Sequence, residues 1–122
     1  MKTKILIVED EHPIAEMYRF KLENEGYLVG VAHDGQQGLD KVEEFGPSLI
    51  LLDLKMPVMS GDEMLEKLRS KDGGVGIKVI VLTNISKDEA PPILRFLNVD
   101  RYVVKAHHTP KQIVGIIEEV LA

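Results

Sequence analysis

Carboxylates stand directly after two apolar segments of the chain, and their type and placement are suited to chemistry. Asp53 follows the run Leu49–Leu52, and Glu9 and Asp10 follow the run Ile5–Val8. Three carboxylates held close together cannot all stay ionised without compensation, which a divalent cation usually provides. Oxygen ligands that leave room for water favour Mg²⁺. The pattern therefore predicts an acidic Mg²⁺ pocket, against the alternative that these acids are only solvated or cap the next helix.

A hydroxyl and an ammonium group end two further apolar runs. Thr83 follows Val79–Leu82, and Lys105 follows Tyr102–Val104. Beside a metal-bound carboxylate these groups make a phosphoryl-transfer site, in which the carboxylate attacks phosphorus while metal, lysine and hydroxyl share the charge on the equatorial oxygens. Taken singly, Thr83 could be a cap and Lys105 a surface charge. The coincidence at all four strand ends favours the chemistry.

Strand and helix patterns alternate along the whole chain, and they would place these side chains together. The expected strands are residues 5–8, 27–32, 49–52, 79–82 and 102–104. Short unbroken apolar runs are typical of parallel strands covered on both faces. Short crossovers between such strands give a right-handed parallel sheet with helices on both faces, and its carboxyl edge is where open α/β proteins bind ligands.

The helical segments between the strands have recognisable ends. Capping-box spacing occurs at Asp34 with Gln37, at Ser60 with Glu63 and at Thr109 with Gln112, while Pro13 fits a first turn and Gly26 and Gly46 fit helix ends. The fourth helix is irregular, because Pro91 and Pro92 cannot lie inside it. We expect a short helix from near Pro92 to about Leu97.

Composition bounds the class of protein. The 122 residues suit one domain, residues 1–122, with 44% hydrophobic and 29% charged residues. The net charge of −5 argues against direct binding to nucleic acid or to an anionic membrane. The chain has no cysteine, which excludes disulfides, thiol nucleophiles and cysteine-based zinc sites. There is no signal-peptide core and no run of roughly 20 apolar residues, so we expect a cytoplasmic protein.

These residues together resemble a response-regulator receiver domain of two-component signalling (CheY-like) over essentially the whole chain. The segment Asp53–Gly61 fits the family pattern D-x-x-M-P-x-M-x-G at every fixed position. The other matching residues are Glu9, Asp10, Thr83, Lys105 and Tyr102. The resemblance implies an α/β fold, namely a doubly wound five-stranded parallel sheet with five helices in the flavodoxin-like order 2-1-3-4-5.

The resemblance also implies roles at the acidic pocket. Asp53 would accept a phosphoryl group from a phosphohistidine on a histidine kinase or histidine phosphotransfer protein. Asp10, Asp53 and the backbone carbonyl of Lys55 would bind Mg²⁺ directly, and Glu9 would act through water. Such a domain is no enzyme with a separate substrate, since it catalyses only its own phosphorylation and dephosphorylation.

The same resemblance implies a switch. Lys105 and Thr83 would contact the phosphoryl oxygens, and movement of Thr83 would let Tyr102 turn inward. This would reshape the face built from the fourth helix, fifth strand and fifth helix, which would then bind a downstream protein, a fused output domain or a second copy. The chain ends at Ala122 without an output domain, which is expected either for a single-domain regulator or for a segment of a longer one.

Three positions depart from the family pattern. Asn84 stands where a small residue is usual, and its bulk can shield the phosphoryl group from water. Ala106 replaces the proline that normally follows the lysine, so we expect a trans peptide bond at Lys105–Ala106. Asn98 replaces a glycine at the end of the fourth helix and tolerates the left-handed conformation there.

Other interpretations are open. Asn84 and Ala106 keep a docking module that works without phosphorylation as one alternative. A metal-dependent phosphohydrolase is a second, although Lys55 occupies the position where such enzymes carry another acid. The loop 73–76 precedes a strand, so it is a flexible connection rather than a phosphate-binding loop. The histidines lack i, i+4 spacing with one another, which argues against a transition-metal site.

The last helix carries a wide apolar stripe. Its members are Ile113, Val114, Ile116, Ile117, Val120 and Leu121. Burial of the helix explains most of them. We expect one edge, at Val114 or Ile116, to stay partly exposed and to contact a partner or a second copy.

Overall fold

One parallel sheet organises the computed structural model, which describes residues 2–122. Its strands are β1 (Lys4–Val8), β2 (Leu28–Ala32), β3 (Leu49–Leu52), β4 (Lys78–Thr83) and β5 (Arg101–Val104). They are ordered β2-β1-β3-β4-β5, and every neighbouring pair is parallel. The expected strand order is confirmed.

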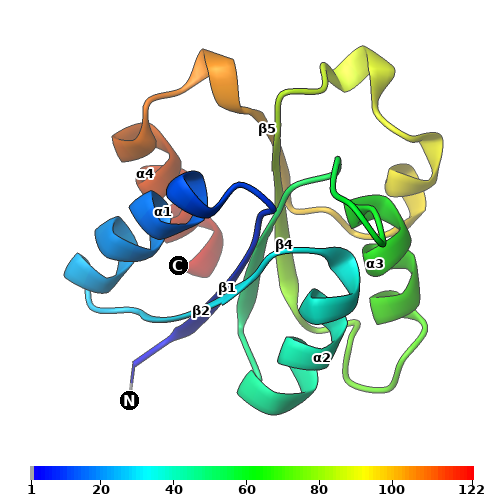
Figure 1. Ribbon diagram of the computed structural model, residues 1–122, viewed down its shortest axis with the longest axis horizontal. Coiled ribbons are helices and arrows are strands. Elements are labelled where there is room, and N and C mark those ends of the chain that lie inside the picture. Colours follow the sequence, from blue (N-terminus) through cyan, green and yellow to red (C-terminus); the bar gives the residue numbers. More distant parts are fainter. Residues whose placement is uncertain (1) are drawn as a thin grey trace.

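Helices cover both faces of this sheet (Figure 1). They are α1 (His12–Asn24), α2 (Gly35–Phe45), α3 (Gly61–Arg69) and α4 (Pro110–Leu121). Helices α1 and α4 lie on one face, and α2 and α3 lie on the other. The described residues thus contain four α-helices rather than the expected five.

The missing helix is replaced by two short 3₁₀ turns, η1 (Lys87–Glu89) and η2 (Pro92–Phe96). The second begins at Pro92 as expected, but it does not become α-helical. Pro91 is extended, with φ −55° and ψ 127°, because the proline after it disfavours helical geometry. Neither proline can donate a backbone hydrogen bond, so an α-helix cannot run through this segment.

Alternating side chains of the strands build two separate cores. Leu6, Val8, Ile50, Leu52, Val79 and Val81 pack with α2, α3 and η2, whereas Ile5, Ile7, Leu49, Leu51, Ile80 and Leu82 pack with α1 and α4. Successive residues of a strand point to opposite faces, so unbroken apolar runs fill both cores. The sheet is therefore buried on both faces, and its polar chemistry is left to the strand ends.

The predicted helix starts are present with differences in detail. Thr109 caps α4 with both hydrogen bonds of a capping box. Asp34 accepts from the backbone N–H of Gln37, but the Gln37 side chain accepts from the N–H of His33 rather than from that of Asp34. Ser60 precedes α3 without a side-chain capping bond.

Two departures from the family pattern are accommodated by the backbone. Asn98 has φ 52°, in the left-handed region, as expected at that turn. The Lys105–Ala106 peptide bond is trans, also as expected. Across residues 2–122, no helix has the length and apolar character needed to span a membrane.

Candidate functional site at the carboxyl edge of the sheet

The register of β1 and β3 brings the predicted carboxylates together. Val8 pairs with Leu52, so Glu9 and Asp53 leave the sheet side by side, and the N–H of Asp53 donates to the carbonyl of Val8 at 3.0 Å. Glu9, Asp10 and Asp53 each place a carboxylate oxygen within 4.8 Å of the others. Among residues 2–122 this is the one group of three side chains able to hold a metal ion. Glu9 and Asp53 are only 4% and 8% exposed.

Thr83 ends β4, and Lys105 directly follows the neighbouring strand β5, in the short 3₁₀ turn η3 (Lys105–His107). Lys105 Nζ lies 2.5 Å from Glu9 Oε1 and 3.4 Å from Asp53 Oδ2, so one ammonium group is shared between two carboxylates. Thr83 is fully buried at the end of β4. The structure therefore places all the polar strand-end residues that the sequence singled out at the same edge of the sheet, and it brings the three acids and Lys105 together.

Burial decides the electrostatics of this pocket. Loss of water around Glu9 raises its pKa to about 6; the hydrogen bond from Lys105 opposes this shift, and the charge of Asp53 adds to it. Burial alone would lower the pKa of Lys105, but its hydrogen bond with Glu9 and the charge of Asp53 raise it above the ordinary value. Lys105 therefore stays charged, and its ammonium group pairs with two of the three carboxylates.

The donor set fits Mg²⁺. All three candidate side chains offer carboxylate oxygens, the hard ligands that Mg²⁺ prefers, and they converge on one point at the sheet edge. One oxygen of Asp53 accepts from the N–H of Leu54 at 2.8 Å, and the other faces Lys105. A single lysine does not balance three acids, so the pocket has an excess of negative charge that a divalent cation would compensate.

The loop after Asp53 closes tightly on its own backbone. The N–H of Gly61 donates to the carbonyl of Leu54 at 2.8 Å, and a Cβ at Gly61 would lie 2.0 Å from the carbonyl oxygen of Asp53. Only glycine fits this approach. The N–H of Met59 donates to the carbonyl of Pro57, which closes a γ-turn around the residue between them.

A short chain of contacts links the pocket to β5. The N–H of Ile85 points to Thr83 Oγ1 at 3.4 Å, and Tyr102 donates from its hydroxyl to the carbonyl of Ile85 at 2.8 Å. Thr83 and Tyr102 are therefore joined through one residue of the loop after β4. Tyr102 is half-buried in this arrangement.

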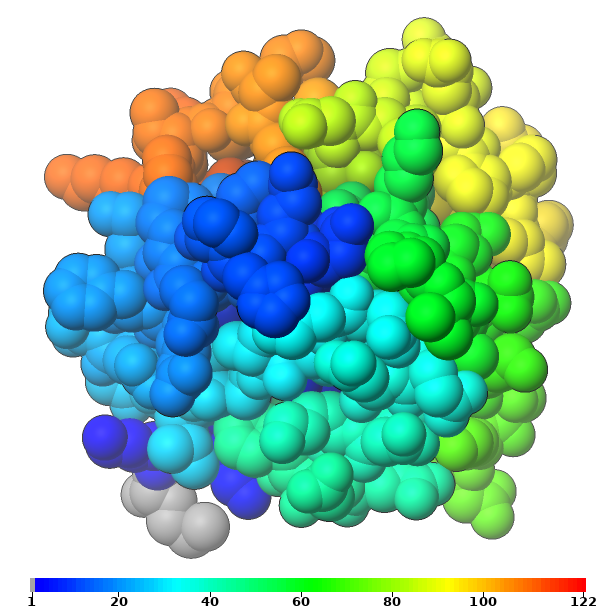
Figure 2. Space-filling model, in the orientation of Figure 1, coloured from blue at the N-terminus to red at the C-terminus, as the bar shows by residue number. Residues whose placement is uncertain are grey.

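Sequence reasoning missed one group beside the pocket, the pair His12 and His33. Their rings stack with centroids 3.7 Å apart, and His33 Nδ1 lies 3.0 Å from the carbonyl oxygen of Glu9. A signal existed, because His12 follows β1 closely, His33 follows β2 directly, and these two strands are neighbours. Figure 2 shows the start of α1, the turn after β2 and the loop after β3 meeting on one face of the molecule.

Comparisons with known proteins agree with this architecture. Residues 5–118 match the family described as "Response regulator receiver domain". The chain is 42% identical over 123 residues to the uncharacterized transcriptional regulatory protein YkoG of Bacillus subtilis, covering 99% of this chain and 49% of that protein. The chain thus spans about half the length of the curated relative that it matches.

Solved structures show the same likeness. A CheY-like response regulator receiver domain protein from Methanospirillum hungatei superposes with a TM-score of 0.88 at 34% identity, covering 99% of this chain and 94% of that one. The chemotaxis protein CheY4 of Vibrio cholerae superposes with a TM-score of 0.90 at 26% identity, covering 98% and 99% of the two chains.

Proposed function

The chain belongs to the response regulator receiver domain family, and from this premise we propose that it is a phosphorylatable switch in which Asp53 accepts a phosphoryl group from a phosphohistidine. The observation that carries this proposal is a buried carboxylate, Asp53, beside two further acids and Lys105. The donor would be a histidine kinase or a histidine phosphotransfer protein in the cytoplasm. A receiver domain is a signalling module rather than a true enzyme. We assign this role to residues 1–122 as one domain.

In the proposed reaction, the Asp53 oxygen that faces Lys105 attacks phosphorus. The new oxygen–phosphorus bond forms as the phosphorus–nitrogen bond of the donor breaks, and the leaving imidazole takes up a proton. The N–H of Leu54 holds the other oxygen of Asp53 and thereby orients the carboxylate. Lys105 and Thr83 would hold the equatorial oxygens of the transferred group, where negative charge collects.

The metal site would be built by Asp10, Asp53 and the backbone carbonyl of Lys55, with Glu9 acting through water. When bound, Mg²⁺ would neutralise the charge that three acids and a phosphoryl group bring together. The tight pairing of Glu9 with Lys105 supports its indirect role, because the ammonium already occupies one of its oxygens.

The switch face would lie around Tyr102. A cavity of about 680 Å³ is lined by residues of η1, η2 and β5, including Pro91, Arg95 and Tyr102. Phe96, which also belongs to η2, is 78% exposed and offers an apolar anchor to a partner. We propose that it binds a downstream protein, a fused output domain or a second copy once Asp53 is phosphorylated.

The last helix, α4, contributes fewer exposed residues to this face than the sequence suggested. Val114 is buried and Ile116 is partly exposed, so of the two positions expected at the edge only Ile116 is available for contact. We propose Ile116 as a contact residue. Replacing it with aspartate should weaken association with a partner or a second copy while the protein stays folded.

Phosphorylation is tested by incubating the protein with acetyl phosphate and Mg²⁺ and measuring its intact mass. We expect the wild type to gain one phosphoryl group and Asp53→Asn to gain none. Asp72→Asn, which changes an exposed aspartate far from the pocket, is the matched control and should label like the wild type. An unlabelled wild type would favour the docking module that works without phosphorylation.

A further inference from the structure

Residues 32–35, which join β2 to α2, contact the loop after β1 and the loop after β3. Ala32 accepts from the N–H of Glu9 at 2.9 Å, and His33 Nδ1 lies 3.0 Å from the carbonyl oxygen of Glu9. Two residues later, the N–H of Gly35 donates to the carbonyl of Met59, in the loop that follows the phosphoacceptor strand, at 3.0 Å. This turn therefore holds the loop after β1 and the loop after β3 at the same time.

His33 is held through its backbone and through its ring. Its backbone N–H donates to Gln37 Oε1 at 2.9 Å, and its ring stacks on His12 at an interplanar angle of 12°. A carbonyl oxygen can only accept, so the Nδ1 atom that faces Glu9 must carry the proton. His33 is thus a fixed hydrogen-bond donor to the backbone of Glu9.

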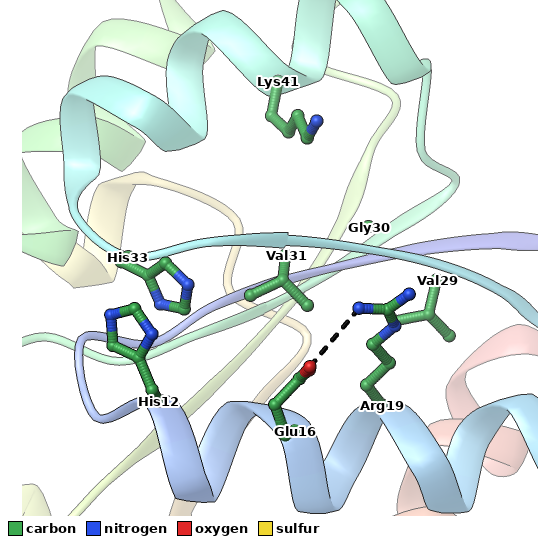
Figure 3. Close-up of a pocket in the computed structure, with 8 residues that line it drawn as sticks. All are labelled: His12, Glu16, Arg19, Val29, Gly30, Val31, His33 and Lys41. Carbon is green, nitrogen blue, oxygen red and sulfur yellow. Dashed lines mark hydrogen bonds and ion pairs between the residues drawn. The ribbon is translucent and has the colours of Figure 1, made fainter.

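Two other uses of this histidine pair fit the geometry poorly. The nitrogen lone pairs of two stacked rings lie in nearly parallel planes, here with ring centroids 3.7 Å apart, so they do not converge on one metal ion. A cavity of about 370 Å³ lies beside the pair, but Glu16 and Arg19 in its wall pair with each other at 3.4 Å (Figure 3). The hydrogen bond from His33 to the backbone of Glu9 is therefore the contact that suggests a role for this histidine.

The carbonyl that His33 holds belongs to the peptide unit joining Glu9 to Asp10. With the N–H of Glu9 also held by Ala32, the backbone of Glu9 is fixed on both sides. The direction in which Asp10 leaves this peptide unit is fixed with it. Metal ligands whose orienting partners are removed typically lose affinity for the metal.

We propose that His33 is a positioning residue for the Mg²⁺ site, acting through the Glu9–Asp10 peptide, with His12 holding its ring. This inference rests on the proposed Mg²⁺ site. It adds a residue outside the acidic cluster on which the metal affinity depends.

The test compares His33→Leu with His33→Asn, two side chains of nearly equal shape that differ in the presence of an N–H donor. Mg²⁺ is titrated while the amide NMR shifts of Asp10 and Asp53 are followed, and urea unfolding without Mg²⁺ is measured on the same variants. We expect His33→Leu to bind Mg²⁺ about 10-fold more weakly, the lower end of what loss of an orienting partner causes. His33→Asn should recover most of the affinity.

His108 provides a matched control, because its ring nitrogen also lies near a backbone carbonyl, that of Val104 at 3.2 Å. His108→Leu should leave Mg²⁺ affinity unchanged. Wild-type affinity in His33→Leu, or equal weakening in His33→Leu and His33→Asn, overturns the inference and leaves the Mg²⁺ site standing. A wild type that does not bind Mg²⁺, or an Asp10→Asn variant that binds it equally well, overturns the proposed site and the inference together.

Discussion

Burial disfavours the charged form of the Glu9 side chain. Its folded pKa of about 6 lies above the ordinary value of 4.5, chiefly because it is buried. Between these values the folded protein holds a proton that the unfolded chain releases. The contribution of Glu9 to stability is therefore complete below pH 4.5 and is lost as pH rises through 6.

The direction of this pH dependence can be tested by comparing the wild type with Glu9→Gln, whose side chain cannot titrate. Without Mg²⁺, raising the pH from 4 to 7 should lower the free energy of unfolding of the wild type by up to about 2 kcal/mol relative to that of the variant. Urea unfolding across this range measures the difference. Glu16→Gln, which removes an exposed carboxylate, is the control and should follow the wild type. Parallel pH curves for the wild type and Glu9→Gln would contradict the burial argument.

Val58 carries backbone strain in the loop after Asp53. Its φ of 68° is in the left-handed region, which a β-branched residue rarely adopts, and its side chain is 81% exposed. Asparagine tolerates this conformation, so Val58→Asn should raise the free energy of unfolding by about 1 kcal/mol. Val75→Asn is the control, because Val75 is also an exposed loop valine but has no positive φ. Equal changes in the two variants would show that exposure rather than strain is responsible.

For single residues, the sequence predicted position correctly where the residue directly follows or ends a strand. Asp53, Thr83 and Lys105 could be brought to one edge because parallel strands share that edge. His33 could not be assigned, since its importance depends on the direction of a ring nitrogen. The φ of Val58 was equally out of reach, because valine by itself predicts an extended backbone.

Among the elements, the segment between β4 and β5 is hydrogen-bonded to one side chain of α3, that of Arg69. Arg69 donates to the carbonyls of Leu97 at 2.8 Å and Asn98 at 2.9 Å, and to those of Gly74 and Ile77 at 2.7 Å each. One guanidinium thus joins the end of η2 to the loop before β4. Its planar array of donors can satisfy several carbonyls at once. A segment without an α-helix is anchored in this way.

Replacing Arg69 should therefore loosen the segment between β4 and β5. Arg69→Ala should lower the free energy of unfolding by about 3 kcal/mol, since several part-buried carbonyls lose a charged donor. Amide exchange in residues 92–99 should accelerate more than in β1. Arg19→Ala is the control, because its ion pairs with Glu16 and Glu23 are exposed and should cost less than about 1 kcal/mol. Similar losses in both variants would contradict the anchoring role.

The same segment marks the limit of element prediction from sequence. Pro91 and Pro92 correctly placed the start of η2, because a proline excludes itself from a helix interior. They did not reveal that the turn would be 3₁₀, which depends on how Leu94 and Leu97 reach the core. The other strands and helices were accessible because their apolar periods and capping residues point to one conformation each.

Across the whole molecule, the acidic pocket and the cavity around Tyr102 lie at different parts of the sheet. The acidic pocket lies at the carboxyl ends of β1 and β3, whereas the cavity around Tyr102 lies beside the outer strand β5. Thr83 and Ile85 form the connection between them, through contacts of 3.4 Å and 2.8 Å. We expect a change that draws Thr83 toward the pocket to move the carbonyl that holds Tyr102 as well, because Ile85 lies two residues after Thr83 and contacts both side chains.

This connection predicts that Tyr102→Phe can still be phosphorylated but no longer transmits the structural change to residues 85–98. The variant loses the hydroxyl that donates to Ile85 but keeps every group around Asp53, so labelling by acetyl phosphate should persist. In the wild type, labelling should change amide exchange in residues 85–98, and in Tyr102→Phe this change should be much smaller. Tyr27→Phe, which alters a half-buried tyrosine outside the switch face, should behave as the wild type. If Tyr102→Phe shows the full exchange response, the signal passes from Thr83 to η2 without Tyr102, and the loop alone carries it.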